Sequence, residues 1–255
     1  MSRAKRCFCL AIVCSLWLHP ENCLSQGRLT LDEVSITLEK NAITEHEPVI
    51  LDVRIQSPLS SSLDFDPGYN WENIKIKVID PDGRVWHRPS QESREGMRFS
   101  NAVHVDAGAT ATFSLVASDW FSFDKHGIYR IEVGLRPASS SVNSDLSLQV
   151  LPRDEVALKA ACSALLDRVN NSQSFSASLV AARALADVND SAAVPYLLAA
   201  VKRREFASTM INALGRLNSQ DAINALIQAS KSDDAETSSR ARVALSTLQR
   251  AKERQ

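Results

Sequence analysis

The chain has 255 residues, of which 44% are hydrophobic, and its 29 Lys and Arg side chains nearly balance 30 Asp and Glu. This composition excludes a largely disordered chain and a protein with many membrane spans, and the length is sufficient for one large or two ordinary cores. The net charge is −6 over residues 26–152 and +3 over residues 153–255. Neither part concentrates the positive charge that binds phosphate backbones, so we expect no nucleic-acid partner.

The first 25 residues have the order of an export signal. A basic start is followed by an apolar stretch of twelve residues from Cys7 to Leu18 and then by a polar exit. A stretch of this length is too short to anchor a protein in a bilayer. The sequence therefore predicts a signal peptide over residues 1–25 and an exported protein, periplasmic or secreted, with no membrane span after signal removal.

Cysteine usage agrees with export. Four of the five cysteines lie in the leader, which leaves Cys162 without a partner for an internal disulfide. A lipoprotein acylated at Cys14 or Cys23 is the competing interpretation, but neither cysteine follows the small residue that a lipobox requires. Cys162 lies in an alanine-rich helical pattern, which favours a buried, small apolar side chain over a nucleophile.

Residues 34–150 alternate apolar and polar side chains, which places successive side chains on opposite faces of a strand. Turn sequences such as Asp80-Pro81-Asp82-Gly83 separate the runs. Seven or eight short strands with one apolar face each need a second sheet to cover that face. We therefore predict an antiparallel β-sandwich over residues 26–152. The runs are Val34 to Leu38, Val49 to Ile55, Ile74 to Val78, Phe99 to Val105, Phe113 to Leu115, Tyr129 to Leu135 and Leu146 to Val150.

The segment from Gly127 to Val133, with the pattern G-x-Y-x-I-x-V, resembles a strand near the end of many immunoglobulin-like and macroglobulin-like sandwich domains. The resemblance implies that Tyr129 packs at a corner of the sandwich and that its hydroxyl bonds back to the chain. It implies a fold alone, because such domains serve many functions. The paired cysteines and the tryptophan of antibody domains are missing, which excludes that subclass.

The loop over residues 64–72 is rich in oxygen-bearing side chains. Asp64, Asp66, Asn70 and Glu72 stand at near-alternate positions and are candidate ligands for calcium, which takes six to eight oxygens. The spacing is not that of a helix-loop-helix calcium site. Turn formation by Asp and Asn is the simpler interpretation of the same residues.

Large aromatic residues lie close to the predicted loops. Tyr69, Trp71 and Trp86 are our candidates for binding a partner, because exposed aromatic side chains anchor interfaces. The alternative is that they close the ends of the sandwich. Trp120 and Phe123 are the better candidates for the core.

After Pro152 the composition turns to alanine and leucine, and the apolar period becomes helical. Residues 184–189 match residues 213–218 at an offset of 29, and Leu214 matches Leu245 at an offset of 31. Self-similarity at this period indicates stacked helical hairpins. The unit resembles a HEAT repeat of the short variety related to phycobilisome lyase repeats, with Pro195 in the first turn of a helix. We predict a short α-solenoid over residues 153–255, with its first helix over 155–169 and its last over 236–253.

The sequence contains no nucleophile elbow, phosphate-binding glycine loop or helical pair of zinc-binding histidines. We therefore expect no enzyme, no cofactor and no metal apart from the calcium alternative. Our leading hypothesis is an exported, non-catalytic protein-binding or scaffold protein, whose partner is another protein of the cell envelope or extracellular space. One alternative is an inhibitor of an extracellular protease that acts through the loop over residues 64–72. Another is a carbohydrate or cell-wall binding module that stacks sugars on Tyr69, Trp71 and Trp86.

Overall fold

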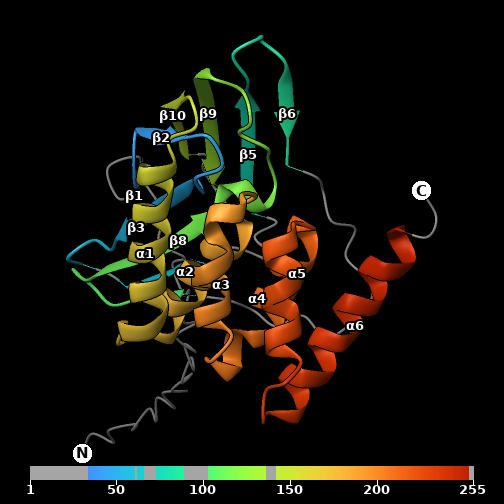
Figure 1. Ribbon diagram of the computed structural model, residues 1–255. Coiled ribbons are helices and arrows are strands. Elements are labelled where there is room, and N and C mark those ends of the chain that lie inside the picture. The colour runs from blue at the N-terminus through green and yellow to red at the C-terminus, as the bar shows by residue number, and fades with distance from the viewer. Residues whose placement is uncertain (1–33, 61, 66–72, 89–102, 136–141, 253–255) are drawn as a thin grey trace, which may run out of the picture.

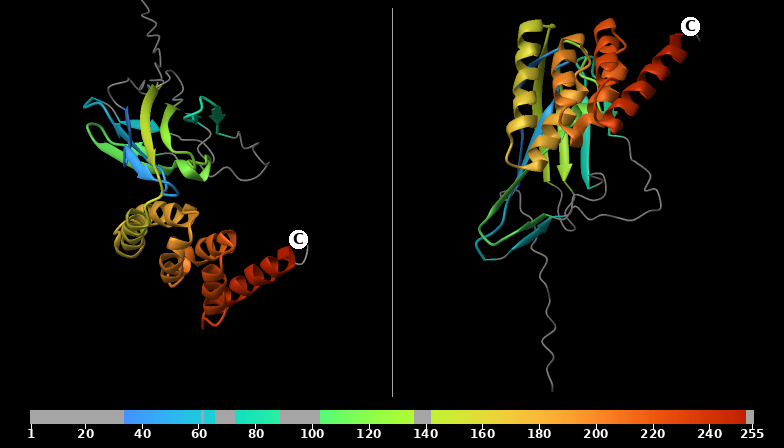
Figure 2. Two further views of the ribbon diagram at one scale, coloured as in Figure 1. Left: turned by 45° about the horizontal axis from the view of Figure 1, so that its top comes forward. Right: turned by 60° about the horizontal axis from the view of Figure 1, so that its bottom comes forward.

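The computed structural model describes residues 34–60, 62–65, 73–88, 103–135 and 142–252. Strands occupy the first part of this chain and helices the second, and the helical array extends away from the strands towards α6 (Figures 1 and 2). The predicted order of strands followed by helices is confirmed. The predicted signal peptide lies outside the described residues.

The strands form two main sheets and a small two-stranded sheet. The first sheet has the order β1-β3-β8, the second has the order β2-β10-β9-β5-β6, and β4 pairs with β7. Side chains of both main sheets meet in one apolar core, which contains Ile36 and Val53 from the first sheet and Ile76 and Ile131 from the second. The strands are β1 Val34–Leu38, β2 Ala42–Thr44, β3 Ile50–Gln56, β4 Leu63–Phe65, β5 Ile74–Ile79, β6 Val85–His87, β7 Val103–Val105, β8 Thr110–Val116, β9 Gly127–Leu135 and β10 Val142–Leu151.

One strand pair departs from the antiparallel prediction. The short strand β2 pairs with β10 in parallel, with Ile43 opposite Val150. The reason is a change of sheet: β1 pairs with β3, but a few residues later the chain has crossed to the edge of the second sheet, where it runs alongside β10. The other strand pairs in the described part of the chain are antiparallel.

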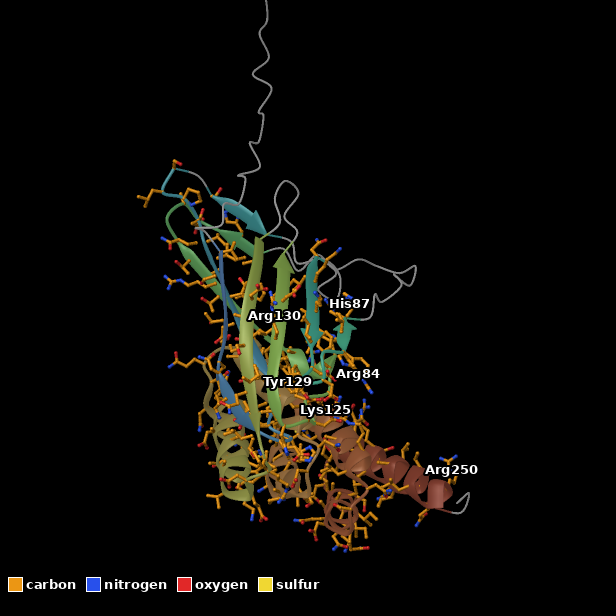
Figure 3. All side chains as sticks on the ribbon, turned by 90° about the horizontal axis from the view of Figure 1, so that it is seen from above. Arg84, His87, Lys125, Tyr129, Arg130 and Arg250 are labelled. Atoms are coloured by element: carbon orange, nitrogen blue, oxygen red, sulfur yellow. The ribbon has the colours of Figure 1, made fainter. Side chains whose placement is uncertain are left out.

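The beginning of β9 is a corner whose geometry matches the resemblance noted for this segment. The Tyr129 side chain is 1% exposed, and its hydroxyl oxygen accepts a hydrogen bond from the Lys125 amide at 3.0 Å. Gly127 has φ 132°, and a Cβ added there would lie 2.8 Å from Cβ of Pro81, so only glycine fits. Lys125 and Tyr129 lie at the end of the strands that faces the helices (Figure 3).

Six α-helices follow, and both terminal helices lie close to their predicted bounds. Asp154 caps the first of them by accepting hydrogen bonds from the amides of Val156 and Ala157. Pro195 stands in the first turn of its helix, as predicted. The helices are α1 Glu155–Asn171, α2 Phe175–Asp187, α3 Val194–Ala200, α4 Arg204–Leu217, α5 Gln220–Ala229 and α6 Ala235–Lys252, with the short 3-10 turns η3 Ala117–Asp119 and η4 Ser191–Ala193.

The helices form two layers. Helices α1, α3 and α5 are neighbours in one layer, and α2, α4 and α6 are neighbours in the other, which we call the inner layer. Among the described residues, the inner helix in extensive contact with the strand part is the first one, α2, through β8 and η3. The inner faces of α4 and α6 therefore continue beyond the strands (Figure 2).

The helices have their own apolar core, which two strand residues join. Ile50 at the start of β3 and Val116 at the end of β8 pack with buried residues of the helices, among them Leu158 and Leu185. The rest of the strand core is a separate cluster. The two parts thus have distinct cores, which meet where β3 begins and β8 ends.

Candidate functional site

The segment that joins strands to helices is held at both sides. The Thr44 hydroxyl donates to the Pro152 carbonyl at 3.0 Å and accepts from the Asp154 amide at 2.7 Å. Arg153 pairs with Asp190 through two hydrogen bonds, Nε to Oδ2 at 2.6 Å and Nη2 to Oδ1 at 3.1 Å. The bonds from Arg153 lower the pKa of the Asp190 carboxyl. These contacts fix the start of α1 against β2 and against the turn that precedes α3.

Two further ion pairs connect strands to helices away from that segment. Arg168 of α1 donates from Nη1 to both carboxylate oxygens of Glu39, at 2.9 Å each. Arg183 of α2 pairs with Asp119 of η3. The pairs restrict the relative movement of the two parts, because each one joins a residue of the strand part to a residue of a helix.

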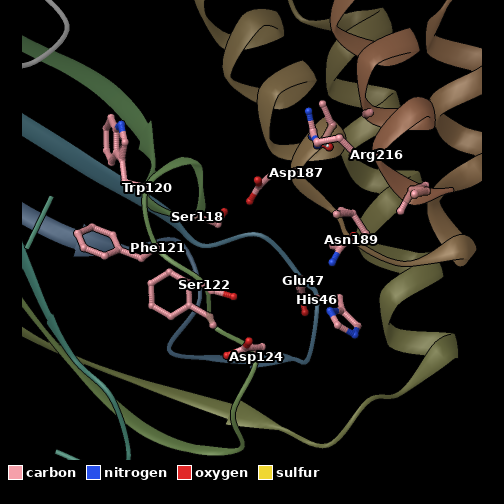
Figure 4. A pocket seen from close by; sticks show the side chains of 15 residues that line it. His46, Glu47, Ser118, Trp120, Phe121, Ser122, Asp124, Asp187, Asn189 and Arg216 are labelled. Atoms are coloured by element: carbon pink, nitrogen blue, oxygen red, sulfur yellow. Dashed lines mark hydrogen bonds between the residues drawn. The ribbon is translucent and has the colours of Figure 1, made fainter. Parts of the chain in front are cut away.

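A cleft of about 740 Å³ opens between the two parts (Figure 4). One wall consists of Ser118 and residues 120–124, which follow β8, together with His46 and Glu47. The other wall consists of the C-terminal ends of α2 and α4, including Asp187 and Arg216. The cleft therefore lies where the strand part covers the inner helical layer.

Asp187 faces Ser118 across this cleft (Figure 4). Burial raises the pKa of the Asp187 carboxyl, while a hydrogen bond with the Ser118 side chain and the charge of Arg216 oppose the rise. The Ser118 hydroxyl oxygen also accepts from the Val49 amide at 3.2 Å. Asp187 has no ion pair within the described part of the chain. Its carboxylate is thus a polar group in the cleft that is held by a hydroxyl and by distant charge.

Arg216 bridges two inner helices. Its Nη2 atom donates to the Ala186 carbonyl at 2.7 Å, which satisfies one of the free carbonyls at the end of α2. Arg203 does the same for α1, because Nη1 donates to the carbonyls of Val169 at 2.7 Å and Asn170 at 3.2 Å at the end of that helix. Two arginines at the two ends of α4 therefore bond the carbonyl ends of both helices of the preceding hairpin.

Two ionisable side chains of the cleft wall, Glu47 and His46, contact other charged groups of the protein. The Glu47 side chain is 7% exposed, and its carboxylate is paired with Lys40 and accepts from the Thr44 amide at 3.2 Å. Nε2 of His46 lies 3.6 Å from the Glu45 carboxylate. These groups already have partners within the protein, so the cleft offers them as fixed polar surface.

Most of the predicted calcium ligands cannot be placed. Asp66, Asn70 and Glu72 lie outside the described residues, and Asp64 lies in β4 with His104 opposite in register. Among the described residues no group of three or more acidic, histidine or cysteine side chains is arranged to hold a metal ion. The calcium hypothesis stays a prediction.

Of the three candidate partner-binding aromatics, only Trp86 can be placed, because Tyr69 and Trp71 lie outside the described residues. Trp86 is 52% exposed and lies in β6, the edge strand of the second sheet. Phe123, at 7% exposed, belongs to the strand core, and Trp120 packs against that core, as predicted. The guanidinium of Arg88 stacks on the Trp120 ring at 4.2 Å.

Cys162 has the structural role that its alanine-rich surroundings predict. It is a free cysteine, 0% exposed in the helical core, and burial raises the pKa of its thiol to about 12. A thiol in this state is not a nucleophile at neutral pH.

No sequence pattern points directly to the cleft. Its walls come from the two halves of the chain, so the order of elements alone does not bring them together. One available signal was the repeat itself, which places Asp187 and Arg216 at equivalent positions, 29 residues apart, and so on neighbouring inner helices.

In a comparison with known families, residues 162–246 match the model of HEAT repeats. This confirms the HEAT-like character that the repeat offsets predicted. No curated protein sequence matches the chain. No helix among the described residues is both long and apolar enough to cross a membrane.

Similarity to solved structures is slight. A β-glucosidase from Listeria innocua is 15% identical with a TM-score of 0.28, and the match covers 46% of this chain and 16% of that one. Spo0M, a sporulation control protein from Bacillus subtilis, is 12% identical with a TM-score of 0.29, covering 55% of this chain and 54% of that one. A β-glucuronidase from Bacteroides uniformis is 16% identical with a TM-score of 0.27, covering 46% and 13%. The chain spans less than a fifth of these glycosidases and about half of Spo0M. Scores at this level carry no argument about activity.

Proposed function

We propose that the protein is an exported, non-catalytic scaffold, in which an immunoglobulin-like sandwich and a short HEAT solenoid bind another protein through one joint surface. The observation that carries the proposal is the placement of the strands on the first inner helix. Ion pairs at Glu39 and Asp119 hold the two parts together around the cleft, and the inner faces of α4 and α6 continue beyond it.

HEAT repeats support this proposal because stacked hairpins form extended surfaces that bind proteins. The fixed joint adds a second element. A binding surface assembled from two rigid parts loses less conformational entropy on association than one carried on a flexible linker. Export is inferred from the leader over residues 1–25 alone.

Position-specific photo-crosslinking in the producing cell tests partner binding. A photoreactive residue is placed at Asn189, which lines the cleft, at Trp86 on the sheet edge, or at Val156, which is 79% exposed on the outer helix α1. We expect a discrete adduct from Asn189, from Trp86 or from both, and none from Val156. No adduct at any of the three sites, or one equal adduct from all, would contradict the scaffold function.

Export is tested separately by N-terminal sequencing of the protein recovered from each cell fraction. We expect a mature chain beginning near Gln26 in the periplasm or the medium. An uncleaved chain retained in the cytosol would remove the export half of the proposal and leave the binding half standing.

One observation favours a second candidate. Trp86 presents an indole that is 52% exposed beside Val85, which is 49% exposed, and aromatic faces of this kind bind sugars. Co-sedimentation with peptidoglycan and insoluble polysaccharides, compared between the native chain and Trp86→Ala, tests the carbohydrate-binding alternative. The protease-inhibitor alternative stays a prediction, since most of its loop lies outside the described residues.

A further inference from the structure

Two hollows lie along the inner layer, one on each side of Arg216. The first is the cleft described above, between α2 and α4 under the strands. The second is a groove of about 650 Å³ between α4 and α6, which we call the open groove. Arg216 lines both.

The repeat makes these hollows equivalent. In the cleft, α2 contributes Ala186 and Asp187; 29 residues later stand Gly215 and Arg216, which α4 contributes to the open groove. The correspondence continues on the other wall, where each residue of α4 has its counterpart 31 residues later on α6: Ala213 with Ala244, Arg216 with Thr247, and Leu217 with Leu248. The open groove is thus the same structural position, one repeat further along.

The two hollows differ in what lies over them. Over the first hollow lies a segment of the strand half, and its Trp120, Phe121 and Asp124 line the hollow. Within the described part of the chain, the open groove is lined by α4 and α6 alone. The open groove is therefore the inner-layer hollow that the described strands leave uncovered.

The surface of the open groove suits an acidic and apolar occupant. Val243 is 60% exposed there, and its neighbours on the floor are small, since a Cβ added at Gly215 would lie 3.9 Å from that of Ala244. The charged residues that line the groove, among those described, are Arg216 and Arg240. Helix α6 has one acidic residue against four basic ones, and its basic Arg250 lies at the end remote from the strands (Figure 3).

Arg240 can exchange its present carboxylate partner for a carboxylate of a ligand. Its guanidinium bonds Glu236 on the same helix, Nη2 to Oε1 at 2.7 Å, and its Nη1 donates to Ser208 at 3.0 Å. The Glu236 side chain is 72% exposed, and an exposed i,i+4 pair contributes only a few tenths of a kcal/mol. A carboxylate from a partner can replace Glu236 at little cost.

We propose that the open groove binds a short segment of a partner protein that presents a carboxylate to Arg240 and an apolar side chain to Val243. The proposal rests on the scaffold function and names the surface and the chemistry of the partner. It commits to a second protein, and a second copy of this chain is an outcome that the test must separate.

A phage-displayed library of random dodecapeptides, selected on the full chain, provides the probe. The selected peptides are synthesised, and their affinity is measured by fluorescence anisotropy. We expect enrichment of Asp or Glu next to an apolar residue, and binding that weakens as salt is raised. Selected peptides without acidic residues would overturn the proposal, as would the absence of any selected peptide that binds in solution.

Matched variants identify the surface. Arg240→Glu is compared with Arg242→Glu, which makes the same charge change on the same helix but outside the groove lining. Val243→Asn is compared with Val156→Asn on α1. We expect each groove variant to weaken the peptides by at least about tenfold and each control by less than about twofold. Equal losses for a variant and its control would sink the assignment.

All four positions are exposed, and thermal unfolding confirms that each variant is folded. Sedimentation of the native chain examines self-association: a dimer that Val243→Asn dissociates would assign the groove to a second copy and overturn the proposal for a different partner. If crosslinking from Asn189 or Trp86 persists in Arg240→Glu while no groove effect is seen, the scaffold function stands and the groove proposal alone fails.

Discussion

The strand half and the helical half of this protein bury their apolar residues in different ways. The strand core is built from large side chains, including Tyr129, Leu51 and Leu148, that come from the strands and their loops. The helical core is rich in alanine and includes two residues from the strands, Ile50 and Val116. The strand half therefore forms its apolar core from its own residues, whereas the helical half depends on the strands for part of its core.

Replacing Ile50 tests this dependence most directly. The side chain is 5% exposed, so Ile50→Ala should cost about 2–5 kcal/mol in the free energy of unfolding. Because the side chain packs into the helical core, the loss should appear in the helices. The measurement is hydrogen exchange of α1 and α2, together with the labelling rate of Cys162, identified by mass spectrometry.

Ile36→Ala is the matched control, since Ile36 is also 5% exposed but belongs to the strand core. It should raise exchange in β1 and β3 and leave the labelling of Cys162 unchanged. If both variants open the helices to the same extent, the two cores act as one and the comparison fails.

A smaller effect is expected where the halves join at Arg153 and Asp190. The folded state lowers the pKa of Asp190. The ion pair therefore stabilises the fold at pH values above the unfolded pKa of about 3.9, and this stabilisation is lost as the pH falls through the pKa of the folded state. Asp190→Asn should therefore melt below the native chain at pH 7, with the difference shrinking below about pH 4. Thermal unfolding from pH 7 to pH 2.5 measures this, and a difference that does not change with pH would contradict it.

The corner at Tyr129 provides an effect confined to the strand half. Tyr129→Phe removes the hydrogen bond from the Lys125 amide while keeping the ring in the core, so we expect a loss of about 1 kcal/mol. Denaturant unfolding gives the value. Hydrogen exchange should rise in β9 and not in α4, and a change in the helices would mean that the corner also supports the joint.

The smallest effect is expected at Trp86. The side chain is 52% exposed on an edge strand, so Trp86→Ala should change the free energy of unfolding by no more than about 0.5 kcal/mol. A loss above about 2 kcal/mol in denaturant unfolding would show that Trp86 is a structural residue, and it would weaken both binding hypotheses that use it.

The sequence predicted the elements whose pattern is local. The runs at Val34 to Leu38 and Ile74 to Val78 form strands, and the repeat offsets located the helices. Strands β2, β4 and β6 were missed, because three residues are too few for alternation to appear. The parallel pairing of β2 follows from a change of sheet, which no periodicity records.

The functional surfaces were harder to predict than the elements. Arg203 precedes α4 and donates to the carbonyl of Val169 at the end of α1, a contact between residues 34 apart in sequence. Likewise the cleft depends on the docking of two halves. Such contacts are determined by tertiary packing, and no local pattern in a single sequence indicates them.

The shared position of Arg216 links occupancy of one hollow to protonation in the other. Its positive charge favours the ionised form of Asp187 against the burial that raises the pKa of that carboxyl. A bound carboxylate that neutralises or withdraws this guanidinium removes the favourable field, and the aspartate then holds a proton more tightly. An acidic ligand that engages Arg216 in the open groove would therefore raise the pKa of a carboxyl that it does not touch.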